Sequence, residues 1–383
     1  MAEHEFPRFI VSVAAMRVSF NALLLTGQSA GLGTLTLGLL QGLQAAECLE
    51  EVVVLVRPGM CQALHLPRWE RCCYHEVPAA RTKAGRLAME LVGLPAYDRK
   101  FQVDVAYSPT SYLPLNQRRP AVATLVDFCW LRAPETVPFL RRLSLHLRME
   151  RSLLRAAGIA TISHSMRKDL LARYGARLHQ PVRAAPLGVD QRFFRVRDGT
   201  TRDPRDRLGI RGSVILASGG TDPRKDVQTL VRGFALLPDA LRRNHHVVII
   251  GSADRGSVRL ILGKPDGGVQ ERVVFTGFIP LAEVLEWFSV ADLLVYPSLD
   301  EGFGLPVLEA MAAGVPVVCS DLEALREVGG DAVSFVPPRS PVILADAMEC
   351  LLTDRSLREQ RIQEGRERAR SFTWTACAQE SRP

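Results

Sequence analysis

The 383-residue sequence lacks an apolar run of the roughly 18 residues that a membrane-spanning helix needs. It also lacks internal repeats and low-complexity segments. The first 15 residues carry Glu3, His4 and Glu5 where a signal peptide would carry positive charge, so we expect no secretion signal and interpret residues 1–15 as an N-terminal extension. With 47% hydrophobic and 23% charged residues, the composition is that of a globular protein, for which we expect a cytoplasmic location.

The eight cysteines form no pattern typical of a metal or disulfide framework. None belongs to a C-x-x-C motif, and Cys72 and Cys73 are adjacent, which suits neither a zinc knuckle nor an ordinary disulfide. We therefore expect reduced thiols. No cluster of histidine and cysteine offers another ligand set, so the sequence predicts no metal site.

Positive charge is concentrated in the first half of the chain. Residues 16–195 hold 24 Lys and Arg against 13 Asp and Glu, whereas the rest of the chain holds 24 against 28. This excess indicates an acidic partner for the first half, such as a phospholipid surface or a phosphorylated acceptor. No aromatic-and-basic recognition motif supports nucleic acid, which we do not expect as a partner.

Short β-branched runs alternate with longer amphipathic stretches along the whole chain, which favours parallel sheets covered by helices. The polar segment 198–204 interrupts this alternation and is typical of a linker. We predict an α/β protein with two doubly wound domains, 16–197 and 198–365, that face each other across a cleft. Such sheets bind ligands at the carboxyl ends of their strands. We expect strands near 18–25, 52–56, 103–107, 121–126, 158–163, 182–187, 214–217, 246–250, 272–275, 292–296, 315–318 and 332–336.

The strongest local pattern follows the predicted strand 292–296. Two glycines, Gly302 and Gly304, form a turn before a helix that we expect to open at Pro306, where proline is favoured. Backbone N–H groups and the positive helix N-terminus make such a turn a receptor for a phosphate or a sugar hydroxyl. Glu301 precedes the turn. Glu309 lies one turn inside an apolar helix, where a buried carboxylate needs a partner.

A second pattern follows the predicted strand 213–217. Two glycines precede Arg224 and Lys225, and we expect a helix over 226–237. Arginine can bind a diphosphate through two hydrogen bonds, while lysine supplies a compact charge. A solvated pair is the ordinary interpretation of Arg-Lys, and the position at a strand end beside the first pattern favours an anion site.

Together these motifs resemble the retaining family-four glycosyltransferases with the GT-B fold. The resemblance rests on Glu301 and Glu309 with seven residues between them, on Arg224-Lys225, and on the segments 161–165, 186–190 and 274–279, in this order along the chain. It implies a retaining glycosyltransferase that moves a hexose, mannose by analogy, from a nucleotide-diphosphate sugar to a glycan or lipid-linked acceptor for a bacterial surface polysaccharide.

The resemblance also implies roles for individual residues. Arg224 and Lys225 neutralise the diphosphate, Glu301 orients the sugar, and Glu309 holds the ribose. The donor-binding set further includes Gly302, Phe303, Gly304 and Leu305 by their backbone N–H groups, Phe278 beside the base, and Gly33 in a loop at the cleft. Asp-x-Asp, the metal clamp of the other major glycosyltransferase fold, is absent from the sequence, so we expect no cofactor and no metal requirement.

One position departs from the family pattern. Many relatives carry His-Asp where this chain has Val126-Asp127. We retain Asp127 as a candidate catalytic residue, with a structural role as the alternative. The missing histidine leaves open a non-catalytic nucleotide-sugar-binding protein, and another GT-B enzyme such as a sugar-nucleotide epimerase is the second alternative.

Residues 139–157 predict a cationic amphipathic helix. An ordinary covering helix with a solvated basic face is one interpretation. Peripheral contact with an anionic membrane, at the inner face of the cytoplasmic membrane, is the other. By analogy with the family, residues 366–383 are expected to cross back onto the N-terminal domain.

Overall fold

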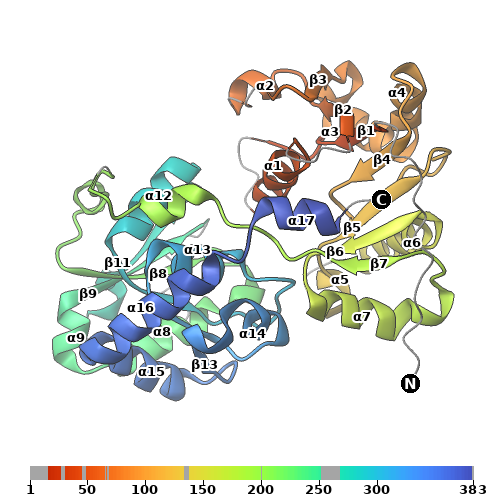
Figure 1. Ribbon diagram of the computed structural model, residues 1–383. Coiled ribbons are helices and arrows are strands. Elements are labelled where there is room, and N and C mark those ends of the chain that lie inside the picture. The colour runs from red at the N-terminus through yellow and green to blue at the C-terminus, as the bar shows by residue number, and fades with distance from the viewer. Residues whose placement is uncertain are drawn as a thin grey trace.

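The computed structural model describes residues 16–26, 31–44, 49–64, 66, 69–132, 138–199, 201–251 and 268–381. The predicted extension 1–15 lies outside this part of the chain. The described strands form two parallel sheets, each covered by helices, in two lobes (Figure 1). This confirms the predicted α/β class with two doubly wound sheets.

The seven-stranded sheet of the N-terminal half has the order β3-β2-β1-β4-β5-β6-β7, and every neighbouring pair is parallel. Its centre consists of apolar strands buried on both faces, as a parallel sheet between helices requires. The strand order reverses between β1 and β4, the position at which such sheets open a crevice. The strands are β1 (Met16–Asn21), β2 (Leu49–Val56), β3 (Cys72–Glu76), β4 (Val105–Ser108), β5 (Ala121–Leu125), β6 (Gly158–Thr161) and β7 (Val182–Ala184).

Helices cover both faces of this sheet. They are α1 (Gly31–Gln44), α2 (Met60–Ala63), α3 (Lys83–Ala88), α4 (Leu94–Lys100), α5 (Cys129–Arg132), α6 (Phe139–Arg155) and α7 (His164–Tyr174). Ser163 caps α7 by accepting a hydrogen bond from the Met166 N–H, as expected of a serine at this position.

The C-terminal half repeats the same plan with the order β10-β9-β8-β11-β12-β13. Here the order reverses between β8 and β11. The strands are β8 (Ser213–Ser218), β9 (His245–Ile250), β10 (Val273–Gly277), β11 (Ala291–Tyr296), β12 (Val317–Ser320) and β13 (Ser334–Val336). The helices are α8 (Val227–Leu236), α9 (Asp239–Asn244), α11 (Val269–Arg272), α12 (Leu281–Val290), α13 (Leu305–Ala313), α14 (Glu323–Gly329), α15 (Pro341–Thr353) and α16 (Arg355–Ala369).

The last described helix, α17 (Trp374–Glu380), lies on the N-terminal half beside α1 (Figure 1). The Trp374 ring fills the space where Gly38 of α1 has no side chain, since a Cβ there would lie 2.1 Å from the ring. The predicted boundary after residue 365 falls inside α16, so the chain leaves the C-terminal half only after Ala369.

The first boundary also differs from the predicted position at residue 197. The 3-10 turn Gln191–Arg195 already packs on the C-terminal half, because Phe193 makes an edge contact with Phe288 of α12, with ring centroids 5.2 Å apart. The Arg197 guanidinium likewise donates to the Ala313 carbonyl at 3.1 Å. Residues from both ends of 191–197 therefore contact the C-terminal half, ahead of the predicted linker at 198–204.

Candidate active site

The carboxyl ends of β8 and β11 meet those of β5 and β6 from the other sheet. Ser163, two residues after the end of β6, donates its hydroxyl hydrogen to the Gly302 carbonyl at 2.7 Å. A Cβ on Gly302 would lie 2.3 Å from the Val126 carbonyl oxygen. Only glycine therefore allows the turn before α13 to approach the loop after β5 so closely.

Further polar contacts join the halves around this point. The Glu327 carboxylate accepts hydrogen bonds from the N–H groups of His164 at 2.9 Å and Ser165 at 3.0 Å, at the positive N-terminus of α7. Arg132 forms ion pairs with Asp300 of the C-terminal half and Asp169 of its own half. The two halves are thus in contact beside the motifs identified in the sequence, which include Glu301 and Gly302.

Of the two predicted cations, Lys225 is more deeply buried than Arg224. Its Nζ donates to Glu301 Oε1 at 2.6 Å and to Tyr296 Oη at 2.5 Å. Burial lowers the pKa of Lys225, but the nearby Tyr296 and Glu301 outweigh this and raise it above its ordinary value. The lysine is therefore charged, and an ammonium group has three N–H donors, so one is left beside these two bonds for a ligand oxygen.

A glycine shapes the path of this lysine. Gly219 has φ +117°, and a Cβ on it would lie 2.3 Å from Lys225 Cγ. The glycines between β8 and Arg224 thus let the Lys225 side chain pass over the backbone toward β11, which brings residues from two sequence patterns into contact.

Arg224 is held by a carboxylate that the sequence did not single out. Asp222 accepts from the Arg224 backbone N–H at 2.9 Å, and its two oxygens accept from Nε and Nη2, the latter at 2.7 Å. Burial raises the pKa of Asp222, but the hydrogen bonds from Arg224 have the larger, opposite effect, so the pKa lies below its ordinary value. Nη1 lies 3.9 Å from Asp127 Oδ2 of the other half. Asp222 therefore fixes the guanidinium at the junction of the two halves.

The N-terminus of α13 completes this side. The helix begins at Leu305, one residue before the predicted Pro306, and its N-cap Gly304 has φ +107°. A Cβ on Gly304 would lie 2.4 Å from Leu325 Cδ2, and Phe303 is buried. The first-turn N–H groups have no partner inside the helix, so this end attracts anions.

Glu309 lies one turn further into α13. Burial first, and then the charge of Asp190, raises its pKa from 4.5 to about 8. Asp190 itself stays charged, because hydrogen bonds from Arg192 outweigh the effect of burial and lower its pKa. Within the described part of the chain, no group makes a hydrogen bond or ion pair with the Glu309 carboxylate. Glu309 is thus a carboxyl group at this site that a ligand hydroxyl could reach.

The structure therefore brings together Asp127, Arg224, Lys225, Glu301 and Gly302, with Glu309 in the adjoining helix. Two further predicted residues lie elsewhere. Gly33 belongs to the first turn of α1 rather than to a loop, which corrects the prediction, and the loop before it is outside the described residues. Phe278 follows β10, with 43% of its surface exposed, and its predicted contact with a base is untested.

Sequence reasoning missed Asp222 and Tyr296 as parts of the site. The sequence does carry a signal for Asp222, which is the Asp-Pro-Arg order of residues 222–224. An aspartate two positions before the arginine can accept a hydrogen bond from the arginine backbone N–H and so close a turn. In the described residues, no group of three or more His, Cys, Asp or Glu side chains is arranged to hold a metal ion. Metal independence remains a prediction.

Two doubly wound parallel sheets with facing carboxyl ends, and a cationic site beside a helix N-terminus, define a GT-B glycosyltransferase. The family described as "Glycosyl transferases group 1" matches residues 205–368, which include every site residue of the C-terminal half. The O-antigen chain mannosyltransferase B of Escherichia coli is 30% identical over 288 residues, which cover 73% of each chain. The protein belongs to the group 1 glycosyltransferases, which sets aside the epimerase and binding-protein alternatives.

Other similarities are partial in sequence or limited to the fold. The phosphatidyl-myo-inositol mannosyltransferase of Mycobacterium leprae is 33% identical over 171 residues, 44% of each chain. The crystal structure of WaaG, a glycosyltransferase involved in lipopolysaccharide biosynthesis, superposes with a TM-score of 0.69 at 20% identity, covering 94% of this chain and 97% of WaaG. Anabaena HepE in complex with UDP and glucose gives 0.69 at 17% identity, covering 95% and 97%. These structures support the GT-B architecture.

Proposed function

We propose that this glycosyltransferase moves a hexose from a nucleotide-diphosphate sugar to a hydroxyl group of a glycan or lipid-linked acceptor, with retention of the anomeric configuration and without a metal ion. The observation that carries the proposal is the convergence of Arg224, Lys225 and Glu301 beside the N-terminus of α13. Two fixed cations and a helix N-terminus together supply the positive charge that a diphosphate leaving group requires.

The proposed chemistry uses these residues in fixed roles. Arg224 and Lys225 bind the diphosphate and stabilise the negative charge that grows as the bond between C1 of the sugar and the diphosphate breaks. The acceptor oxygen bonds to C1 on the same face, and its proton passes to the departing phosphate oxygen. Glu301, held by Lys225, accepts from hydroxyl groups of the sugar, and Glu309 accepts from those of the ribose.

Mannose is the proposed sugar, and a surface polysaccharide precursor is the proposed acceptor. The support is the 30% identity to an enzyme named O-antigen chain mannosyltransferase B over 73% of the chain. The similarity to a phosphatidyl-myo-inositol mannosyltransferase agrees with the same sugar.

Thermal unfolding with GDP, UDP, ADP and their common sugar conjugates tests the donor site. Saturation at 100 times the dissociation constant adds about 2.7 kcal/mol, roughly 5–10 °C for a unit of about 200 residues. We expect one nucleotide to stabilise the wild type and not the Arg224→Ala/Lys225→Ala variant. The control Arg211→Ala/Arg232→Ala removes two exposed arginines of the same half. The proposed site would be contradicted if no nucleotide stabilised the wild type. It would also be contradicted if a nucleotide stabilised the Arg224→Ala/Lys225→Ala variant as much as the control variant.

The stereochemistry and the metal requirement need separate measurements. The product of the stabilising donor should carry the donor's anomeric configuration, as read from the anomeric proton coupling in NMR. Its rate of formation should be unchanged by EDTA. An inverted product, or loss of activity with EDTA that Mg²⁺ restores, would refute the respective part of the proposal.

We also propose that α6 contacts an anionic membrane beside the acceptor. Four apolar side chains of this helix are exposed, with Leu140 at 78% and Phe139 at 64%, followed by Leu143 and Leu147. An apolar face with flanking arginines is typical of a helix that lies in the interface of a bilayer. In the described residues, no helix is both long and apolar enough to cross a membrane.

Flotation with anionic vesicles tests this contact. Phe139→Ser/Leu140→Ser should lose vesicle binding, because the exposed apolar area is removed without a change in charge. Leu236→Ser/Val342→Ser removes two similarly exposed side chains from the C-terminal half and should bind like the wild type. Equal flotation of both variants would refute the membrane role of α6.

A further inference from the structure

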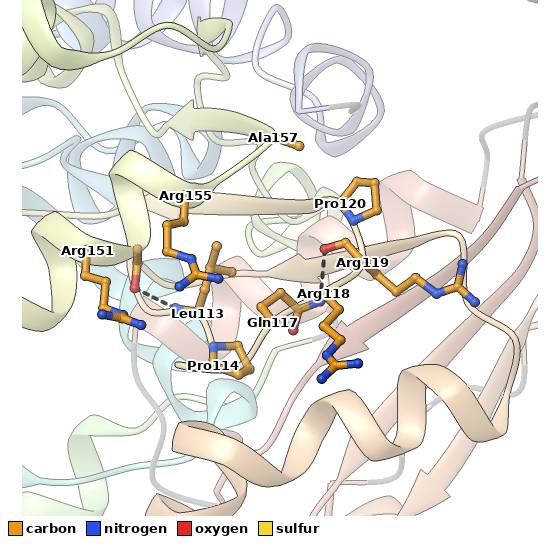
Figure 2. A pocket seen from close by; sticks show the side chains of 10 residues that line it. Leu113, Pro114, Gln117, Arg118, Arg119, Pro120, Arg151, Arg155 and Ala157 are labelled. Carbon is orange, nitrogen blue, oxygen red and sulfur yellow. Dashed lines mark hydrogen bonds between the residues drawn. The ribbon is translucent and has the colours of Figure 1, made fainter.

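A second basic site lies in the N-terminal half, at the other end of its sheet. A pocket of about 270 Å³ is formed by the loop before β5 and the last two turns of α6 (Figure 2). Pro120 precedes β5 and Ala157 precedes β6, so the pocket lies at the amino ends of these strands. The candidate active site lies at their carboxyl ends. This pocket is therefore separate from the proposed donor site.

Three arginine side chains surround the pocket. Arg151 and Arg155 project from successive turns of α6 and Arg118 from the loop, around Pro114 and Gln117, whereas the Arg119 side chain extends away from them (Figure 2). Arg151 donates to the Leu115 carbonyl at 3.3 Å. Within the described chain, none of the three forms an ion pair with a carboxylate.

This concentration of charge is unfavourable for the protein alone. Like charges four residues apart on a helix repel each other, as Arg151 and Arg155 do. The negative end of the helix dipole favours a cation in the last turn of α6, which accounts for Arg155. It does not account for Arg118, which comes from a different segment. The carboxylate closest in the helix, Glu150, is already paired with Arg177 and with His146.

A phosphate group complements such a pocket. Guanidinium groups bind phosphate oxygens through paired charge-assisted hydrogen bonds, and three of them around one cavity match its several oxygens. The pocket is smaller than the 300–1,000 Å³ typical of sites for drug-sized ligands, so it suits a small anion or the head of a larger molecule. Gln117 adds a polar lining, with its amide nitrogen donating to Asp98 at 3.1 Å and its oxygen unpaired in the described structure.

We propose that the pocket formed by Arg118, Arg151 and Arg155 binds a phosphate group, either of a membrane lipid headgroup or of a soluble phosphate compound. The pocket adjoins the end of α6 opposite to exposed Phe139 and Leu140, which lie 11 or more residues earlier in the same helix. Binding here would fix the orientation of α6 on a phosphorylated surface or report the supply of a phosphate compound. This inference does not depend on the donor chemistry proposed above.

The test compares two variants of equal charge. Arg118→Gln/Arg151→Gln/Arg155→Gln empties the pocket of its cations. Arg202→Gln/Arg211→Gln/Arg232→Gln removes three exposed arginines outside it. Inorganic phosphate is titrated into each protein by calorimetry at low ionic strength. The pocket variant should bind at least about tenfold more weakly than the wild type, and the control within about twofold. If the triple variant does not fold, the single variant Arg155→Gln, at an exposed position, takes its place in the titration.

Vesicle flotation distinguishes the two sources of phosphate. Vesicles of phosphatidylcholine with phosphatidic acid are compared with pure phosphatidylcholine, and both variants retain the apolar face of α6. Weaker flotation of the pocket variant than of the control assigns the lipid headgroup. Weaker binding of inorganic phosphate with equal flotation assigns a soluble compound. Equal behaviour of the two variants with both probes, or no binding by the wild type, would overturn the proposal. Stabilisation by the donor nucleotide should be the same in both variants, so a failure of the donor site is seen separately.

Discussion

Replacing Glu309 with glutamine should make the protein more stable and a poorer donor binder at the same time. The carboxyl group is uncharged in the folded protein at neutral pH, because burial and the charge of Asp190 raise its pKa to about 8. In the unfolded chain its pKa returns to 4.5 and it ionises. Unfolding at pH 7 therefore releases a proton, and rising pH favours the unfolded state.

The size of the effect follows from these two pKa values. Below pH 4.5 the carboxyl group is protonated in both the folded and the unfolded protein, so it does not lower the free energy of unfolding. As the pH rises from 4.5 to 8 the free energy of unfolding falls progressively, and above pH 8 it falls no further. Relative to an uncharged amide of the same shape, Glu309 costs the fold about 1 kcal/mol at pH 5, about 3 kcal/mol at pH 7 and about 5 kcal/mol at pH 9. Glu309→Gln should thus gain stability over the wild type by these amounts.

Urea unfolding of wild type and Glu309→Gln at pH 5, 7 and 9 measures this difference. The control Glu271→Gln changes an exposed glutamate of the same half and should show no growing gain. Donor binding should change in the opposite direction, since the NH2 group of an amide only donates, whereas both oxygens of a carboxyl group can accept from a ribose hydroxyl. A stability difference that is constant from pH 5 to 9 would refute the burial argument. Unchanged donor affinity would refute the ribose role.

Three further changes test contacts around the site and the last helix. Asp222→Asn should leave stability nearly unchanged and lower kcat/KM about 10- to 100-fold, because Arg224 loses its paired carboxylate; a decrease in stability without a kinetic effect would contradict this role. Trp374→Ala should lower the free energy of unfolding by about 3–5 kcal/mol in calorimetry, since the ring fills the gap above α1, and a smaller loss than 1 kcal/mol would contradict its anchoring role. Arg132→Gln should raise KM for the donor about 5- to 100-fold by removing an ion pair between the halves, while Arg211→Gln should not; equal KM values would show that this pair does not control closure.

The sequence predicted most of the fold because parallel strands buried on both faces leave a strong apolar signal. Val52–Val56 and Leu293–Val295 are examples in which nearly every side chain is buried. The strand β3 was missed for the converse reason. Its residues, Cys72–Glu76, are half-buried or exposed at the sheet edge and include no β-branched side chain, so neither alternation nor propensity marks it.

The site was predictable to the extent that topology determines it. β8 and β11 are neighbours on either side of the switch point, so residues that follow both strands must meet at one edge. This reasoning brings Lys225 to Glu301 without knowledge of side-chain conformations. The bonds of Asp222 to Arg224, and those of Glu327 to the N-terminus of α7, depend on local turns and on the placement of one half against the other, which sequence periodicity does not encode.

The contacts between the halves lie next to the residues proposed for chemistry, so assembly of the site and closure of the protein are coupled. Gly302 touches the Val126 carbonyl and the Ser163 hydroxyl, while its neighbour Glu301 binds Lys225. Arg224 extends toward Asp127 of the opposite half. A diphosphate bound by Arg224 and Lys225 would therefore add negative charge at the junction itself. At Val126 the chain contributes a backbone carbonyl to this junction. The close approach of Gly302 to the Val126 carbonyl thus does not depend on which side chain residue 126 carries.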